Sequence, residues 1–360
     1  EDFIAVVTDG RQEVYVSDDG GETWDSAFLS SVPPWDASLL IADVAISPEY
    51  EGGERDIAVA TRNPVDGLVA GDVWVVQTAA LSAWGEQEVY DLHPDALTGM
   101  DVSAVAFSSE YADDDTILAV ASDSNDTYLC TGYRDTDTNT TNWDVTEPNN
   151  YVELCELDED SPREDQIVYV SMLLPADYSG DSASGRQVYL SYFANTDEDD
   201  VYWVDDVEVN RRNLDRGSPI AVYSLGWLGG TLCAGEVAAD TDTGRARIHF
   251  CDEPTANYIE WYEPEKRPSG GFGTGVANAI VTSAPGGDWG LCGTSTNLVV
   301  DATGWADTVL PGAWSGNGVG DTPDESAISR AAAGNDYLYW NQISLIDTDM
   351  RELCDYSLWV

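Results

Sequence analysis

Residues 43–62 read DVAISPEYEGGERDIAVATR, and residues 103–123 read SAVAFSSEYADDDTILAVASD. The two stretches align at a constant spacing of 61 residues, so that Ile46 matches Phe107 and Ile57 matches Leu118. Each contains an apolar run, an acidic loop with a tyrosine, and a second run of small apolar residues. Runs that are apolar at nearly every position are typical of strands buried on both faces. The chain is therefore predicted to be a repeat of short β-strands.

Weaker copies of this unit continue along the chain. Each has a first and a second apolar run: Val168–Leu174 with Val188–Tyr192, Ile220–Leu225 with Thr231–Gly235, Ala277–Thr282 with Gly290–Thr294, and Ala327–Ala331 with Tyr337–Asn341. The N-terminal run Phe3–Thr8 matches only the second strand of the unit. The first unit therefore lacks its first strand, unless Ala327–Ala331 supplies it. Trp24, Trp84, Trp143 and Trp305 each follow a third strand.

The stretch Val14–Trp24 reads VYVSDDGGETW and contains the pattern Ser-x-Asp-x-Gly-x-Thr-Trp. The residues of the pattern are Ser17, Asp19, Gly21, Thr23 and Trp24. The aspartate can accept N–H groups of the turn, the glycine permits positive φ, and the tryptophan covers the edge of the sheet. The pattern resembles the Asp-box, or BNR repeat, of sialidases, sortilin-type receptors, xyloglucanases and photosystem-assembly propellers. The loops Ser47–Tyr50 and Ser108–Tyr111 resemble a loop of bacterial surface-propeller repeats.

The resemblance implies an all-β fold, a β-propeller of four-stranded antiparallel blades. We expect seven blades, with six as the alternative, in one domain that spans residues 1–360. The strong resemblance covers about the first third of the chain; beyond it only strand spacing and tryptophans remain. A turn motif of this kind indicates a fold and carries no activity by itself.

The charge of the chain is extreme, with 67 acidic residues against 15 basic ones and a net charge of −52. Such a surface repels phosphate backbones and anionic membrane surfaces, so we expect no nucleic-acid partner. No apolar run is long enough for a membrane-spanning helix, so membrane insertion is not expected either. The acidic coat suits a saline or extracellular setting and favours capture of divalent cations.

Several loops are rich in carboxylate oxygens, which are the ligands that Ca²⁺ prefers. The candidate ligands are Asp113 and Asp115, Asp135 and Asp137, and Asp240 and Asp242, the last two in an Asp-x-Asp-x-Gly sequence. None of these loops has the complete twelve-residue EF-hand pattern. Calcium is therefore the expected cofactor, and solvated acidic turns are the alternative reading.

The six cysteines are even in number and form no CxxC pair. Strand-like surroundings favour cross-strand disulfides between Cys130 and Cys155, between Cys233 and Cys251, and between Cys292 and Cys354. Six cysteines allow fifteen pairings, so connectivity stays open, and free buried thiols are the alternative. The sequons at Asn125 and Asn139 are compatible with glycosylation. Because the chain also opens directly on a strand, as a processed protein would, we expect a secreted or cell-surface protein.

Enzymatic motifs are weak. A sialidase would need an Arg-Ile-Pro motif and a carboxylate-binding arginine triad, and neither pattern is found in the sequence. A glycoside hydrolase needs two facing carboxylates, and a chain with 67 acids cannot nominate a pair from sequence. The two histidines, His93 and His249, lie in no catalytic motif. We therefore expect a protein that is not an enzyme.

The unequal strand count suggests a function. An unpaired strand edge is a template for another chain. The leading hypothesis is a structural subunit of a surface layer or filament, in which copies of the chain complete one another by terminal strand exchange. The alternatives are a secreted module that binds glycans or proteins, and a glycoside hydrolase.

Overall fold

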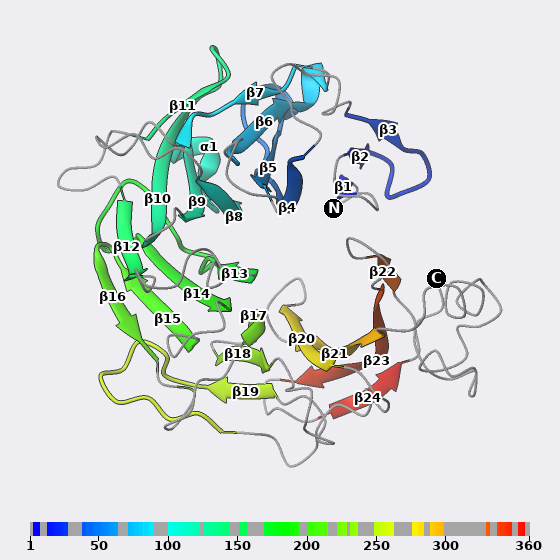
Figure 1. Ribbon diagram of the computed structural model, residues 1–360, viewed down its shortest axis with the longest axis vertical. Helices are drawn as coiled ribbons and strands as arrows, with labels where there is room; N and C mark the ends of the chain where they lie inside the picture. Colours follow the sequence, from blue (N-terminus) through cyan, green and yellow to red (C-terminus); the bar gives the residue numbers. More distant parts are fainter. Residues whose placement is uncertain are drawn as a thin grey trace. The chain divides into compact units, whose positions relative to one another are not determined.

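The computed structural model describes residues 3–7, 13–27, 38–63, 71–81, 83–89, 100–122, 126–143, 151–156, 169–193, 200–212, 214, 222–228, 231–236, 248–262, 276–283, 289–298, 329–331, 337–347 and 352–356. The described strands form six sheets of antiparallel strands, which agrees with the expected all-β fold (Figure 1). The number of blades and their closure stay predictions. The chain divides into two compact units, Glu1–Val188 with Val204–Asn210, and Tyr189–Trp203 with Arg211–Val360.

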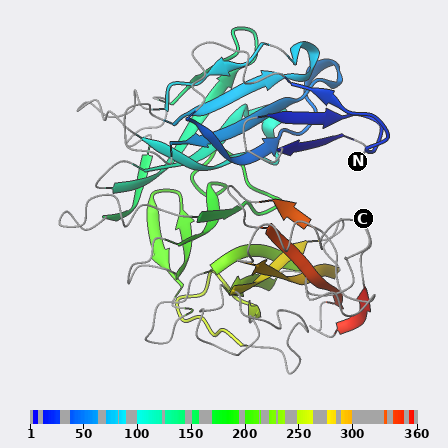
Figure 2. The same ribbon diagram turned by 45° about the vertical axis from the view of Figure 1, so that its right-hand side comes forward.

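The first unit begins with three sheets. Their strands are β1 (Ile4–Val7), β2 (Val14–Ser17) and β3 (Asp25–Ser26); β4 (Leu40–Ile46), β5 (Asp56–Arg62), β6 (Val73–Gln77) and β7 (Gly85–Glu86); and β8 (Asp101–Phe107), β9 (Thr116–Ser122), β10 (Asp126–Asp135) and β11 (Thr140–Asn142), with β12 (Tyr151–Glu156) also paired to β10. Short helices η2 (Glu51–Gly53) and α1 (Tyr111–Asp114) follow β4 and β8, and η3 (Thr78–Ala80) follows β6. In Figure 2 the blue and cyan strands of this unit run side by side within each sheet.

A fourth sheet has the strand order β13 (Tyr169–Leu173), β14 (Gln187–Phe193), β15 (Asp200–Asp205), β16 (Glu208–Arg211). The second unit contains a sheet of β17 (Val222–Leu228), β18 (Thr231–Glu236) and β19 (Ile248–Cys251). Its other sheet comprises β20 (Val276–Ser283), β21 (Trp289–Leu298), β22 (Ser329–Ala331), β23 (Tyr337–Asp347) and β24 (Glu352–Tyr356). Each apolar run expected from the sequence thus contains a strand.

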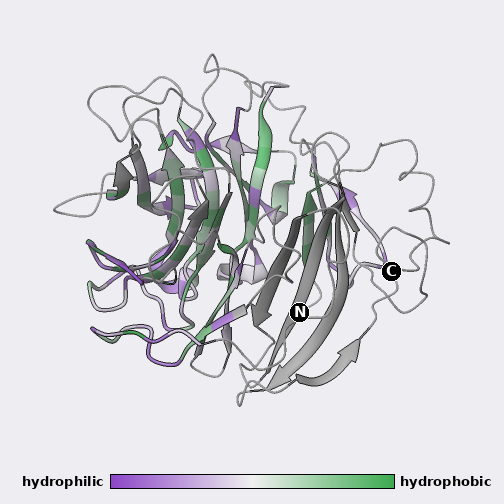
Figure 3. Cartoon of the chain, turned by 60° about the horizontal axis from the view of Figure 1, so that its bottom comes forward, coloured by the Kyte–Doolittle hydropathy of each residue, from purple (hydrophilic) through white to green (hydrophobic). Residues whose placement is uncertain are grey.

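The core of the first unit lies between successive sheets. On one face of β5, Ile57 and Val59 pack in a cluster with Val14 and Val16 of β2. On the opposite face, Ala58 and Ala60 pack in a second cluster with residues of β8 and β9. Both faces of β5 are therefore buried, which is why its sequence is apolar at nearly every position. Figure 3 shows hydrophobic residues concentrated on the strands.

The register of the strands corrects the expected constant repeat. Ile46 pairs with Ile57 in the second sheet, and Phe107 pairs with Ile117 in the third. The first strands therefore repeat after 61 residues but the second strands after 60. Ile57 and Ile117 are equivalent, because each lies in the cluster shared with the preceding sheet. A shift of one residue would have sent their side chains to the opposite face.

Tryptophans join neighbouring sheets by hydrogen bonds. The indole N–H of Trp84 donates to the Ala27 carbonyl at 2.5 Å, and that of Trp143 donates to the Gln87 carbonyl at 2.7 Å. In the second unit, Trp261 donates to the Arg212 carbonyl at 2.8 Å. Each acceptor directly follows the fourth or last strand of the preceding sheet. Of the tryptophans that punctuate the repeat, Trp84 and Trp143 are thus contacts between sheets, whereas Trp24 bonds within its own turn. Trp305 lies outside the described residues, and the sequence reading had missed Trp261.

The strand pairing bears on the two ways in which the terminal sheets were expected to form. The first sheet has three described strands in the order β1-β2-β3, and β1 lies at its edge. The run Ala327–Ala331 contains β22, which pairs with β23, so in this structure it does not complete the first sheet. β21 also pairs with β23. The sequence analysis had placed these two strands in separate copies of the repeat, and the structure joins them in one sheet.

The three expected disulfides are wrong. Cys233 lies opposite Phe250 and Cys251 opposite Leu232, so the two cysteines point to opposite faces of their strand pair. Cys130 lies opposite Tyr151, whereas Cys155 lies opposite Thr127, about 10 Å farther along the strand. Cys292 and Cys354 lie on β21 and β24, on opposite sides of β23. A disulfide requires Cα atoms within about 7 Å.

Cys130, Cys233 and Cys251 are instead free and buried. Burial raises the pKa of each of these thiols, to about 12 for Cys130. They fill the interior as small apolar side chains. The inference of an oxidising compartment from paired cysteines loses this support.

Candidate functional site

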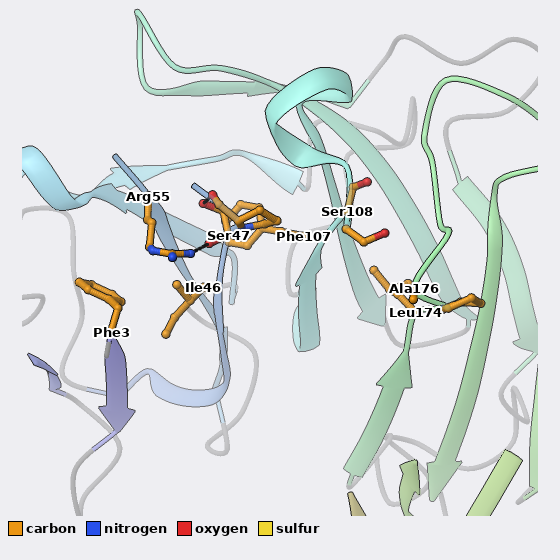
Figure 4. Close-up of a pocket in the computed structure, with 11 residues that line it drawn as sticks. Phe3, Ile46, Ser47, Arg55, Phe107, Ser108, Leu174 and Ala176 are labelled. Carbon is orange, nitrogen blue, oxygen red and sulfur yellow. Dashed lines mark hydrogen bonds between the residues drawn. The ribbon is translucent and has the colours of Figure 1, made fainter. Parts of the chain in front are cut away.

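A pocket of about 480 Å³ lies in the first unit, where three inner strands end (Figure 4). Ile46 ends β4, Phe107 ends β8, and Leu174 directly follows β13. Phe3, which directly precedes β1, lines the pocket beside them. The pocket therefore collects equivalent positions of successive sheets, with residues more than 100 positions apart in the sequence.

Seven of the eleven lining residues are apolar, while polar atoms contribute about half of the surface of the pocket. Besides the four residues above, Pro48, Pro175 and Ala176 line the pocket. The polar side chains are Ser47, Ser108, Ser109 and Arg55, and Arg55 is the only charged one among the lining residues. The pocket therefore combines apolar side chains with polar groups, as ligand sites commonly do.

The three serine hydroxyls are already engaged. The Ser47 hydroxyl donates to the Pro48 carbonyl at 2.8 Å, and the Ser108 hydroxyl donates to Asp114 Oδ2 at 2.6 Å. The Ser109 hydroxyl donates to the Tyr178 carbonyl at 3.0 Å. These serines shape the loops after β4 and β8, and their donor hydrogens are not available to a ligand.

Arg55 is held in place at both its main chain and its guanidinium. Its N–H donates to the Thr78 hydroxyl at 3.0 Å, and its carbonyl accepts the Thr78 N–H at 2.9 Å. Nη1 donates to the Ser47 carbonyl at 2.8 Å, and Nη2 forms an ion pair with Glu49 at 2.9 Å. The guanidinium carbon lies 6.0 Å from the centre of the Phe3 ring.

The edge of β1 begins at this pocket. The Ala27 N–H donates to the Val14 carbonyl, so the main-chain groups of Val14 point toward β3. Val14 lies opposite Val7, and Val16 lies opposite Ala5. Because main-chain groups alternate along a strand, those of Ala5 and Val7 point away from β2. No strand pairs with that edge among the residues that the structure describes.

A buried polar network supports the loops around the pocket. Asp56 Oδ2 accepts hydrogen bonds from Nη2 of Arg134 at 3.0 Å and from the Tyr111 hydroxyl at 2.7 Å. The Tyr50 hydroxyl donates to Asp56 Oδ1 at 2.8 Å. Burial raises the pKa of Tyr50 and of Tyr111, and the Asp56 carboxylate adds to both shifts. Both tyrosines therefore stay protonated donors, and the loops after β4 and β8 are tied to one carboxylate.

The residues that were predicted to form an Asp-box make one turn between β2 and β3, and the Asp-box assignment itself stays a prediction. Asp19 Oδ1 accepts the Ser17 hydroxyl and the Thr23 N–H, both at 2.8 Å. The hydrogen bonds from the Thr23 hydroxyl, the Thr23 N–H and the Ser17 hydroxyl lower the Asp19 pKa to about 2. Gly21 has a φ of 95°, and the Trp24 indole donates to its carbonyl at 3.1 Å. The turn stabilises itself locally and lines no part of the pocket.

The candidate calcium ligands that the structure describes are not among the residues that line the pocket. Asp113 lies in α1 and Asp115 directly follows it with a φ of 50°. Asp135 accepts the N–H groups of Asp137 and Thr138. The Thr138 hydroxyl, together with these two N–H groups, lowers the Asp135 pKa. The described part of the chain contains no group of three or more His, Cys, Asp or Glu placed to hold a metal. Asp240 and Asp242 lie outside the described residues.

One of the two sequons can be placed. The side chain of Asn139 accepts from Arg134 Nη2 at 2.8 Å and donates to the Ala83 carbonyl at 3.1 Å. A glycan would replace one of the two hydrogens of this amide, so the bond to Ala83 would have to use the other. Asn125 lies outside the described residues.

The sequence reading nominated no residue of the pocket as a ligand-binding residue. Its lining residues come from the ends of separate copies of the repeat, and the repeat was the only sequence signal that indicated that such ends lie close together.

Among the described residues, no helix is long and apolar enough to span a membrane.

No family model matches the chain, and no curated protein matches it either. Solved structures do resemble it. A GH74 xyloglucanase from Xanthomonas campestris is 12% identical over 82% of this chain and 45% of its own, with a TM-score of 0.33. A sialidase from Trypanosoma rangeli is 12% identical over 80% and 48%, with a TM-score of 0.39. YCF48 from Cyanidioschyzon merolae is 9% identical over 94% and 92%, with a TM-score of 0.39.

These neighbours are β-propeller proteins, in agreement with the succession of packed antiparallel sheets. The chain spans less than half of the xyloglucanase and of the sialidase. Several of the similar structures are glycosidase-type enzymes, so the expectation that the chain is not an enzyme is withdrawn. At these identities the likeness concerns the fold and assigns no activity.

Proposed function

We propose that this chain binds an extended protein segment by strand addition. The segment pairs with the edge of β1 that no strand occupies among the described residues, and its last apolar side chain enters the pocket beside Phe3. Main-chain hydrogen bonds to an exposed sheet edge provide affinity in this mode of recognition, and pockets for side chains provide specificity. The observation that carries the proposal is the strand pairing at β1. In the next two sheets, β4 pairs with β5 and β8 pairs with β9, whereas no described strand takes the corresponding place beside β1.

The equivalent strands indicate how the segment would lie. β4 pairs antiparallel with β5 and ends at Ile46, opposite Ile57, and β8 ends at Phe107, opposite Ile117. In the first sheet, the Ile-Ala-Val sequence of β1 matches that of β5, so Ile4 corresponds to Ile57. A strand added to β1 in the same manner ends opposite Ile4, which directly follows the pocket residue Phe3.

The chemistry of the pocket favours a peptide over a glycan. A sugar carries many hydroxyls, and each one that is buried without a partner costs free energy. The serine donors that line the pocket are already used within the protein. An extended peptide satisfies its polar groups on the β1 edge, and its last side chain needs only the apolar lining residues of the pocket, such as Phe3 and Ile46. The lining residues include no carboxylate, so glycoside hydrolysis would need another site.

We further propose a second copy of the chain as the donor of the segment. The chain itself contains several strands of the required type, and strand exchange between copies would build an assembly at the cell surface. Export of the chain and calcium bound by its acidic loops belong to the same proposal. Negative-stain microscopy with calcium and then with chelator tests it, and single particles under both conditions would remove the assembly.

The strand addition itself is tested with a synthetic peptide of the sequence Asp101–Phe107, DVSAVAF, with an amidated C-terminus. We expect saturable one-to-one binding in isothermal titration calorimetry. Ala5→Pro removes an N–H from the free edge and leaves the β1–β2 hydrogen bonds in place, so it should abolish binding. Ala5→Ser retains that N–H and should bind like the wild type. Absence of binding to the wild type, or equal binding by both variants, would overturn the proposal.

A further inference from the structure

We infer that the pocket recognises a carboxylate on the bound segment, and that this carboxylate replaces Glu49 on Arg55. The inference rests on the proposed strand addition and specifies its ligand: a peptide whose last apolar residue is followed by an acidic group. The group is either the C-terminal carboxylate of the segment or an Asp or Glu side chain. Both sources present the same planar anion to the guanidinium.

Arg55 is positioned for this role and has capacity left for it. Its main chain is fixed to Thr78 from both sides, and its side chain is about one-fifth exposed. A guanidinium carries five N–H donors, of which the Ser47 carbonyl and Glu49 take one each. The guanidinium that carries the other three N–H donors lies near the Phe3 ring, which lines the pocket. A carboxylate at the end of a strand on β1 would therefore meet a pre-positioned cation.

Glu49 occupies one of these donors loosely. Its side chain is 62% exposed and makes a single contact with Arg55 at 2.9 Å. Exposed ion pairs of this kind contribute at most about 1 kcal/mol. The loop around Glu49 is held independently, because the Tyr50 N–H donates to the Glu54 carbonyl and the Ser47 hydroxyl accepts the Asp56 N–H. The Glu49 side chain can therefore leave Arg55 without unfolding its loop.

The surroundings make the exchange selective. Arg55 is the only charged residue among the described residues that line the pocket, in a chain with a net charge of −52. Acidic ligands are repelled by the rest of the surface, so their affinity depends on short-range contact with Arg55. Glu49 acts as an internal competitor that holds the guanidinium until a better-placed carboxylate arrives. A segment therefore binds best when it pairs with β1 and also places a carboxylate in contact with Arg55.

The test uses three peptides built on the sequence Asp101–Phe107: the free acid, the C-terminal amide, and the amide extended by one glutamate. Each is titrated calorimetrically into the wild type, Arg55→Gln and Glu49→Gln. A hydrogen bond to a charged group corresponds to about a tenfold gain in affinity or more. We expect the free acid or the glutamate peptide to bind the wild type about tenfold more tightly than the amide. The better of these two identifies the source of the carboxylate.

The variants separate the two claims. Arg55→Gln should remove the advantage of the acidic peptides and leave the amide unchanged. Glu49→Gln should strengthen the acidic peptides about threefold, because the competing carboxylate is gone. If all three peptides bind the wild type equally and Ala5→Pro abolishes binding, strand addition stands and the carboxylate inference fails. If no peptide binds, both fail.

Discussion

Asp72, at the start of β6, is 2% exposed and holds three main-chain N–H groups. Its carboxylate accepts from Val73 at 2.7 Å, from Glu88 at 2.9 Å and from Val89 at 3.0 Å. Burial nevertheless raises the Asp72 pKa to about 7, against the effect of these donors. Asp200 repeats the arrangement at the start of β15, with Val201 and Leu214 as donors. Both aspartates precede a valine and an aromatic residue, a signal that the sequence reading left unused.

Asp72→Asn should change how stability depends on pH. The Asp72 pKa is raised on folding, so the protonated carboxyl stabilises the fold below about pH 4, and this contribution is lost as pH rises toward 7. Urea unfolding should show the variant gaining on the wild type between pH 4 and pH 8, by up to about 4 kcal/mol. Asp19→Asn is the control, because the Asp19 pKa is about 2 and its difference from the wild type should stay constant over this range. A constant difference for Asp72→Asn as well would contradict the prediction.

Arg134 is a second residue whose burial leads to a prediction about the free energy of unfolding. Its side chain and that of Asp56 are both fully buried, and Nη1 also donates to Gln87 Oε1 at 2.6 Å. Arg134→Met would leave the Asp56 carboxylate buried without its cation, which costs about 3 to 5 kcal/mol in urea unfolding. Arg186→Met removes a partly exposed pair with Asp206 and should cost under about 1 kcal/mol. Similar losses of unfolding free energy in both variants would show that the buried pair stabilises the fold no more than the partly exposed pair does.

At the scale of the element, the strands were predictable and their contacts were not. Runs such as Ile57–Thr61 are apolar because both faces are buried, so pattern alone locates them. Pattern does not give the loop length between two strands, and the loss of one residue before β9 shifted the repeat from 61 to 60. The disulfide predictions failed because pattern does not give strand register either. Strand-like surroundings placed Cys233 and Cys251 on adjacent strands, but register decided their faces.

The indole hydrogen bonds between sheets are testable at this scale. Trp143 is 4% exposed and donates to the carbonyl of Gln87 in the preceding sheet. Trp143→Phe leaves that carbonyl without this donor and a gap beside it, so thermal and urea unfolding should show a loss of about 1 to 3 kcal/mol. Trp24 is 42% exposed and bonds within its own turn. Trp24→Phe should therefore cost much less, and an equal cost would mean that contact between sheets is not the reason.

The whole molecule raises the question of how so much like charge is tolerated. Of the folding and site features, the sequence alone indicated the all-β class and the acidic surface. It did not indicate the pocket, because the ends of β4, β8 and β13 converge only once the sheets pack. Charge, unlike the pocket, is a property of the total composition, and its consequence for stability can be derived without any single contact.

A net charge of −52 should make stability depend strongly on salt. Repulsion among the carboxylates favours the unfolded chain, in which they lie farther apart. The screening length falls from about 30 Å at 0.01 M salt to about 3 Å at 1 M, so the melting temperature should rise steeply over this range. NaCl and KCl should act alike, because screening depends on ionic strength. Calcium bound at the acidic loops would add a further rise at millimolar concentration, beyond that of a sodium chloride solution of equal ionic strength. If calcium gives only the rise of the matched sodium chloride solution, the acidic loops provide screening charge and no calcium site.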